Sequence, residues 1–158
     1  MEITELEKSY IAGFFDGEGS VIVRMAHHKN GKLSYELNIS IGQNTLDVLK
    51  FIQSKFGGRI ANPNYGHIKQ KHCPDLRMES IRASIFLETI LPYLRIKNKQ
   101  AELAIMFQKL LFPKWAKGLP KVKVTKENWE SRQKYYEAVK FLNRPKFERL
   151  AEVEQFEN

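Results

Sequence analysis

Two stretches in the first third of the chain alternate apolar and polar residues, which is the pattern of strands buried on one face. The apolar members share one face of each stretch: Val21, Val23, Met25, Leu37, Ile39 and Ile41. Asn30-Gly31 lies between the two stretches, and this dipeptide strongly favours a tight hairpin turn. The pattern therefore predicts a long antiparallel hairpin whose apolar face packs under helices.

Helical spacing of apolar residues surrounds this hairpin. It predicts an N-terminal helix over 4–15, capped by Thr4 and ended by Gly17 and Gly19. Asn44 is expected to cap a second helix. The later elements are expected to be a short strand pair at 59–61 and 76–81 and helices at 83–94, 97–112 and 127–142.

The order of these elements is typical of an α+β protein with an antiparallel sheet. A length of 158 residues fits a single domain over 1–158. Within it we expect a core over about 1–112, a basic linker and C-terminal helix over 113–142, and a peripheral acidic tail over 143–158.

Net charge indicates the class of partner. Lysine and arginine number 26 against 18 aspartates and glutamates, which gives a net charge of +8 and an isoelectric point near 9.5. This balance favours nucleic acid over a membrane surface, although a basic protein without such a partner has the same composition. No apolar run reaches the length of about 18 residues that a membrane span needs, so no membrane partner is expected.

Cysteine usage and the N-terminal segment indicate the compartment. A single cysteine, Cys73, excludes an internal disulfide and a cysteine-based zinc site. The first residues are acidic and polar, unlike a secretory signal or an arginine-rich transit peptide. We therefore expect the protein in the prokaryotic cytoplasm, or in a chloroplast or mitochondrion if an organelle encodes it, and not secreted.

An apolar helical run, IAGFFDGEG from Ile11 to Gly19, holds Gly13 and Gly17 four residues apart. Glycine inside a helix costs about 1 kcal/mol relative to alanine, so both positions need a reason. Close approach of a second helix supplies one, because a ridge of small residues lets two helix backbones come together. We therefore predict that a second copy of the chain binds along this helix. The predicted interface residues are Ile11, Gly13, Phe14 and Gly17.

The same run resembles the LAGLIDADG homing-endonuclease motif almost position by position. Ile11 replaces the leading leucine, Phe14 and Phe15 replace the inner pair, and Glu18 stands where the last aspartate is usual. The predicted element order is also that of a LAGLIDADG unit. The resemblance implies the LAGLIDADG homing-endonuclease fold, with an αββαββα core, a saddle-shaped antiparallel sheet and extra C-terminal helices. Because the chain has one copy of the motif, it also implies a homodimer.

The acidic end of the motif is the candidate metal site. Crossing of two such helices would bring both copies of Glu18 together, and paired carboxylates on a basic protein indicate a metal that faces phosphate. The resemblance implies Glu18 and the Gly17 carbonyl as ligands of Mg²⁺, for which Mn²⁺ or Ca²⁺ can substitute in binding. From the residues alone, Glu18 could also be a solvated charge at a helix end, and Asp16 is better explained as a local hydrogen bond or cap.

Two further residues are catalytic candidates by resemblance. Family members place a polar residue after the second strand to order water around the metal; Gln43 stands there, and a solvent-facing turn amide explains it equally well. Lys97 matches a lysine that reaches the active site from the start of a helix, with Lys99 as the fallback. Cations at a helix N-terminus oppose the helix dipole, so a nearby phosphate explains this basic stretch better than solvent alone.

The polar face of the strands is the candidate DNA-reading surface. Its predicted members are Ile22, Arg24, His28, Glu36, Asn38, Ser40, Asp75, Arg77 and Glu79. Arginine suits guanine, asparagine suits adenine and glutamate can accept from cytosine in the major groove. A merely solvated face would show the same polarity.

These observations lead to one main hypothesis: a site-specific double-strand DNA homing endonuclease. It would hydrolyse phosphodiesters with Mg²⁺ in a long, near-palindromic target, leave 3′ overhangs and serve intron homing. The alternative is a non-cleaving RNA maturase or DNA-binding regulator on the same fold; loss of the last acid usually marks these relatives, and Glu18 retains it. An unrelated basic interaction protein would need the motif, the hairpins and the Lys97 stretch to coincide by chance.

Overall fold

The protein is α+β, as the residue pattern predicts. The computed structural model describes residues 3–61, 73–111 and 125–145. The elements follow in the order α1 (Glu5–Glu18), β1 (Gly19–His27), β2 (Leu33–Gly42), α2 (Leu46–Phe56), β3 (Arg59–Ala61), β4 (Asp75–Glu79), α3 (Ser80–Ile90), a short 3₁₀ turn (Leu91–Tyr93), α4 (Asn98–Leu111) and α5 (Lys126–Leu142). Both expected strand pairs and all the expected helices are therefore present.

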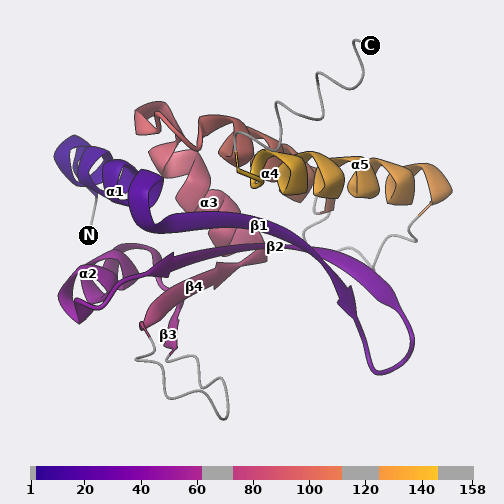
Figure 1. Ribbon diagram of the computed structural model, residues 1–158, viewed down its shortest axis with the longest axis horizontal. Helices are drawn as coiled ribbons and strands as arrows, with labels where there is room; N and C mark the ends of the chain where they lie inside the picture. The colour runs from indigo at the N-terminus through magenta and orange to yellow at the C-terminus, as the bar shows by residue number, and fades with distance from the viewer. Residues whose placement is uncertain (1–2, 62–72, 112–124, 146–158) are drawn as a thin grey trace.

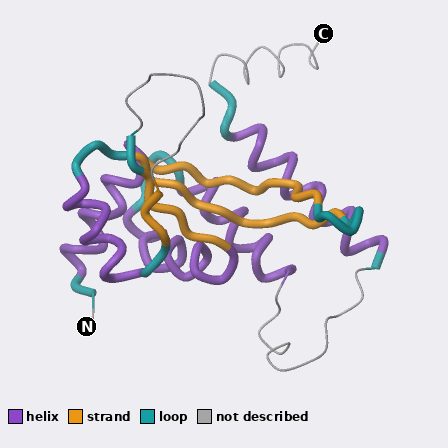
Figure 2. Tube along the Cα trace, turned by 90° about the horizontal axis from the view of Figure 1, so that it is seen from below, coloured by secondary structure: helices purple, strands orange, loops and turns teal. Residues whose placement is uncertain are grey.

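The strands form one antiparallel sheet in the order β1-β2-β4-β3. β1 and β2 pair from Gly19 opposite Ile41 to His27 opposite Leu33. Seen from below in Figure 2, these two strands run side by side across the molecule. In Figure 1, α1, α3, α4 and α5 gather above the curved sheet and α2 lies at one end of it. The sheet thus has one face under the helices and one face turned away from them, which we call the open face.

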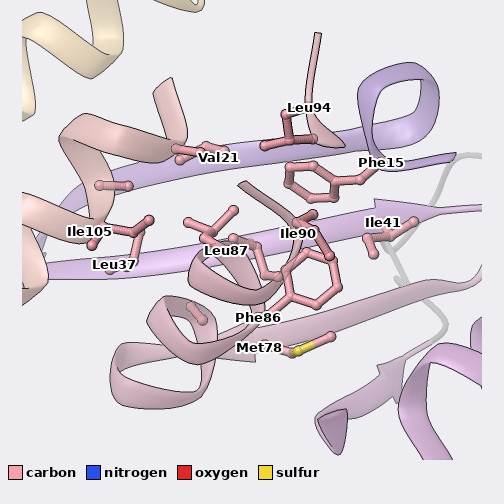
Figure 3. Packing of buried hydrophobic residues seen from close by; sticks show 14 of the residues in the cluster. Phe15, Val21, Leu37, Ile41, Met78, Phe86, Leu87, Ile90, Leu94 and Ile105 are labelled. Carbon is pink, nitrogen blue, oxygen red and sulfur yellow. The ribbon is translucent and has the colours of Figure 1, made fainter. Parts of the chain in front are cut away.

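The core lies between the covered face of the sheet and the helices. Phe15 of α1 and Phe86 of α3 are fully buried, and their ring centroids are 5.2 Å apart. Figure 3 shows Ile41 and Ile90 beside these two rings, so β2, α1 and α3 all contribute to the same cluster. This cluster fixes α1 on the sheet, and with it the acidic end of the motif.

The phase of the hairpin alternation is confirmed except at one position. The predicted inward residues Val21, Val23, Leu37, Ile39 and Ile41 are each at most 5% exposed. Met25 was expected in the same set but is 39% exposed. Its cross-strand partner Tyr35, on the same face, is 5% exposed, so the helices still cover β2 at this point but leave Met25 on the edge strand β1 partly uncovered.

Two predicted helix ends are displaced. Thr4 is the cap of α1, and Glu7 completes a capping box with it, as the sequence predicts for Thr4. Gly17 does not end α1, because the helix continues to Glu18 and Gly19 is the capping residue. Asn44 is not the cap of α2; Thr45 occupies the N-cap position without a side-chain cap bond.

Helix α5 packs on the sheet through a tyrosine that the residue pattern did not single out. Tyr35 of β2 is 5% exposed, and its ring lies 4.8 Å from Trp129 and 5.5 Å from Tyr136. Burial raises the pKa of the Tyr35 hydroxyl. After the helix, Asn143 Nδ2 donates to the Val21 carbonyl at 2.8 Å, so the tail predicted as peripheral from 143 begins with a fixed residue.

Several expectations lie outside the described residues. They concern most of the basic linker, the tail beyond 145 and the segment between β3 and β4. Within the described ranges, none of the helices combines the length and apolar character needed to cross a bilayer.

Candidate active site and nucleic-acid interface

Glu18 stands at a junction where helix changes directly into strand. It is the last residue of α1, and Gly19 is both the helix cap and the first residue of β1. A Cβ at Gly19 would lie 2.1 Å from the Phe15 ring, so only glycine lets the chain turn this closely around the core. The Glu18 side chain is exposed at this turn. The junction therefore holds the carboxylate at the end of a rigid helix.

Asp16 fastens the loop before α4 to this junction. The residue is 8% exposed, and its carboxylate accepts from the backbone amides of Arg95 (2.7 Å), Ile96 (3.2 Å) and Lys97 (2.9 Å). A carboxylate that receives several amide hydrogen bonds makes a strong, geometrically fixed contact. Asp16 therefore has the structural hydrogen-bonding role that was expected of it, but the expectation of a local bond is wrong, because its partners are about 80 residues away in the chain.

Lys97 reaches the end of α1 because of this attachment. Its ammonium donates to the Asp16 carbonyl. Burial lowers the pKa of Lys97, while attraction by Asp16 and by Glu18 acts in the opposite direction. The two residues predicted from the motif and from the later basic stretch, Glu18 and Lys97, are thus brought to one place. Lys99, the fallback, is exposed on the first turn of α4.

The donor set at this place fits a hard divalent cation. Across the described ranges, no cluster of three or more histidines, cysteines or carboxylates could enclose a metal ion. What one protomer offers is the Glu18 carboxylate and the Gly17 carbonyl, which lies too near the helix end for an intrahelical partner. Mg²⁺ is usually bound by one or two carboxylates together with waters and substrate phosphates, and these residues match that pattern.

Gln43 follows β2, as expected, but its side chain is engaged locally. Its Oε1 accepts from the backbone amides of Asn44 at 2.7 Å and Thr45 at 3.5 Å. The backbone N–H of Gln43 donates to the Pro74 carbonyl at 3.0 Å. Of the two interpretations that the sequence left open, this geometry is that of the turn amide. A role in ordering water stays a prediction.

The residues predicted for the dimer interface divide between two faces of α1. Ile11 is fully buried in the core of its own protomer, so its side chain does not lie on the outer face of the helix. Gly13 and Gly17 are exposed, and a Cβ at either would meet no atom within 4 Å. Phe14 is half-buried and its ring stacks against Tyr10. No close packing among the described residues of this chain therefore explains the glycine ridge.

The open face carries a hydrogen-bonded set of side chains across three strands. Arg24 of β1 donates to Glu36 Oε2 of β2 from Nε (3.2 Å) and from Nη2 (3.0 Å). Asn38, with its amide nitrogen towards β4, donates to Glu79 Oε1 at 3.3 Å and accepts from Arg24 Nε at 3.2 Å. Ile22 and His28 lie on the same surface, and His28 Nε2 is hydrogen-bonded to Ser34 Oγ at 2.8 Å. Most predicted reading residues are thus brought together.

Asp75 departs from the prediction for this surface. It was expected to face DNA, but it is 7% exposed. Its Oδ2 accepts from Ser40 Oγ at 3.0 Å and from Arg77 Nε at 2.5 Å. Arg77 keeps a side chain that is 39% exposed. Of this trio, Arg77 is the one with substantial access to a ligand.

Three residues of the open face were missed by the sequence reasoning. Ser20 pairs with Ser40, Arg59 pairs with Arg77, and Ser34 contacts both His28 and Glu36. Ser20 and Ser34 could have been found by extending the alternation to the ends of both strands. Arg59 required the pairing of β3 with β4, which a three-residue strand does not reveal by pattern.

Comparison with known proteins decides the family. The profile of the LAGLIDADG endonuclease family matches residues 11–109, which is more than half of the chain. This chain belongs to the LAGLIDADG endonuclease family. No curated protein sequence matches it. The family match extends from α1 into α4 and so includes Glu18, the open-face strands and Lys97.

Solved LAGLIDADG structures share the fold. The homing endonuclease I-CvuI, in complex with the I-CreI target, aligns with a TM-score of 0.71 and 22% identity over 90% of this chain and 85% of that chain. The archaeal intron-encoded homing endonuclease I-Vdi141I, complexed with DNA, aligns with a TM-score of 0.71 and 18% identity over 89% and 86%. The meganuclease I-AabMI aligns with 91% of this chain but 48% of its own, at a TM-score of 0.60 and 20% identity. The LAGLIDADG fold expected from the motif is confirmed.

Proposed function

We propose that this LAGLIDADG protein is a Mg²⁺-dependent, site-specific endonuclease for double-stranded DNA that acts as a homodimer. The observation that carries the proposal is the placement of Glu18 and Lys97 at one end of α1, with Asp16 holding both segments together. A carboxylate and a cation beside a polar sheet face match the requirements of phosphodiester hydrolysis. The proposal extends to a long, near-palindromic target, 3′ overhangs and intron homing.

The outer face of α1 supports the homodimer. Leu6 is 84% exposed and Tyr10 is 52% exposed, and they continue the helical stripe that includes Gly13 and Gly17. Exposed apolar side chains beside two unexplained glycines suit an isologous helix contact. Such a contact would bring the Glu18 residues of both protomers to the middle of the assembly.

The open face supports DNA as the substrate. β2 is 10 residues long, which spans roughly 33 Å and thus about one turn of DNA. The arginines and Asn38 on this face have donor groups that match base edges in the major groove. Among the structural relatives, I-CvuI was solved with its target in the presence of Ca and I-Vdi141I was solved with DNA. Two copies of the face, related by a twofold axis, would read a near-palindrome.

The catalytic roles follow from the chemistry of each residue. When bound, a divalent metal would neutralise charge on the phosphate and activate water. Glu18 and the Gly17 carbonyl would hold that ion against the end of α1. Lys97 would stand as a cation beside the scissile phosphate and stabilise charge that develops there. Asp16 keeps Lys97 in position by binding the backbone on which it stands.

A cleavage experiment with a selected target tests the proposal. A duplex chosen by the native protein from a randomised pool is incubated with Mg²⁺ or with EDTA, and the cut ends are sequenced. We expect both strands to be cut at fixed positions with 3′ overhangs, in Mg²⁺ alone. Glu18→Gln keeps the shape of the side chain and removes its charge, so it should bind the duplex without cutting it.

Two outcomes would overturn the nuclease proposal. If the native protein binds its selected duplex and leaves it intact in Mg²⁺, the chain is a DNA-binding regulator. If it selects RNA over DNA, it is a maturase. Cleavage by Glu18→Gln at the native rate would remove Glu18 from the site.

A further inference from the structure

Asp75 is too deeply buried to read DNA directly. It belongs to the polar face of β4, yet it is 7% exposed. Its Oδ2 already accepts from Ser40 Oγ and from Arg77 Nε, and its buried Oδ1 has no hydrogen-bond partner among the described residues. A buried carboxylate is costly unless charged or hydrogen-bonding partners compensate it. Arg77 supplies such a partner.

The hydrogen bond from Arg77 Nε to Asp75 fixes the inner edge of the Arg77 guanidinium group. The Nε atom lies at the base of the guanidinium group, so a bond there sets the direction of the whole group. The Arg77 side chain remains 39% exposed. In the pairing of β2 with β4, Arg77 lies opposite Ser40, whose hydroxyl donates to Asp75. Asp75, two residues before Arg77 on the same strand, thus holds the arginine at Nε, and Ser40 of β2 holds Asp75.

We propose that Asp75 is a positioning residue for sequence recognition: it holds Arg77 in the orientation that reads a base and makes no base contact itself. The inference rests on the proposed DNA-binding function of the open face. A side chain that is already held in its binding orientation loses less conformational entropy when DNA binds. Because it cannot readily reorient, a non-matching base lowers the binding affinity more. Asp75 therefore contributes to discrimination between sequences.

The Arg24–Glu36 pair provides the internal comparison. That pair also joins an arginine to a carboxylate on the open face, but its side chains are 55% and 36% exposed, against 10% for the Asp75 side chain. Glu36 can therefore reach DNA itself, whereas Asp75 can act only through the side chains that it contacts, of which Arg77 is the charged one. Removing Glu36 should change recognition in its own right.

The test is a base-preference profile, measured by selection from a randomised duplex pool. Arg77→Ala first identifies the base pairs that Arg77 reads. Asp75→Ala and Asp75→Asn should then weaken preference at those base pairs, by about tenfold for alanine, which corresponds to roughly 1.4 kcal/mol. Asp75→Ala combined with Arg77→Ala should match Arg77→Ala alone, because the two residues act through one contact. Glu36→Ala should alter other base pairs.

Stability is measured separately from recognition. Asp75→Asn keeps the side-chain volume and one acceptor, so it should remain folded even if alanine does not. A folded Asp75→Ala with the native profile would overturn the proposal, as would a change, in either Asp75 variant, confined to base pairs that Arg77→Ala leaves intact. If the native protein selects no sequence at all, the proposed DNA-binding function fails instead.

Discussion

Lys97 is a partly buried lysine whose charge state responds to folding. Burial lowers its pKa from the ordinary value of 10.5. In the unfolded chain the pKa of Lys97 returns to its ordinary value. Between the folded-state pKa and this unfolded-state pKa, the unfolded chain binds more protons than the folded chain, so the free energy of unfolding rises with pH in that interval. Lys97→Met should remove this rise, as urea denaturation at a series of alkaline pH values would measure. Titration of Tyr35 changes the free energy of unfolding equally in the native protein and in Lys97→Met, so it cancels when the two are compared.

The same substitution tests catalysis. Lys97→Met should slow cleavage of the selected duplex while DNA affinity changes little, because its Nζ lies at the acidic junction and not on the open face. Lys99→Met, on the exposed first turn of α4, is the matched control and should cut at nearly the native rate. Equal loss in both variants would contradict a specific role for Lys97.

We predict that Arg24 reads a base directly. Arg24→Ala should weaken binding by about 1–3 kcal/mol and relax preference at particular base pairs in each half-site. Lysines of the basic linker should instead weaken binding to every sequence and flatten its dependence on salt. Filter binding to the selected and scrambled duplexes at two salt concentrations separates the two effects. A profile unchanged by Arg24→Ala would exclude this residue from the reading surface.

Single residues show where sequence reasoning succeeds and where it stops. Alternation assigned Val21 and Ile39 correctly, because the phase of a strand is a local property. It misplaced Met25 and Asp75, since burial depends on what covers a position, and that is decided by distant elements. The partners of Asp16 could not be predicted for the same reason.

At the scale of elements, the attachment of α1 to the start of α4 is the contact to break. Asp16→Ala would leave three backbone amides without their acceptor, and we expect a loss of about 2–3 kcal/mol in the free energy of unfolding. Cleavage should fall as well, because Lys97 would no longer be held. Glu102→Ala, on the exposed side of α4, should stay within about 0.5 kcal/mol of the native protein. Urea denaturation measures both; equal stability of the two variants would contradict the role of Asp16.

The elements themselves were well predicted, and their ends were not. Periodicity identified every helix because each buries one long apolar stripe. Helix ends depend on individual hydrogen bonds, and here Gln43 accepts from the backbone amides of Asn44 and Thr45 while Thr45, not Asn44, stands at the N-cap position. Glycine was also a misleading stop signal at Gly17, where α1 continues to Glu18 and the proposed dimer contact offers another reason for the glycine.

At the scale of the whole molecule, two glycines of one motif should respond in opposite ways. The Cβ of a leucine at position 13 would meet no described atom of its own chain within 4 Å, so in Gly13→Leu the chain should stay folded while the helices of two copies are held apart. Gly19→Ala would push a methyl group into the Phe15 ring and should destabilise the protomer itself. Light scattering and circular dichroism at micromolar concentration distinguish these results. A native protein that is monomeric in solution would contradict the homodimer.

The direct passage from α1 into β1 has a consequence for the geometry of the target. No loop separates the helix proposed to join the two protomers from the strand proposed to read DNA. The distance and rotation between two half-sites are then set by covalent backbone, with no hinge to absorb a change. One base pair inserted at the centre of the target shifts a half-site by about 3.4 Å along the DNA axis. Such a spaced target should escape cleavage even though both of its half-sites keep their full sequence.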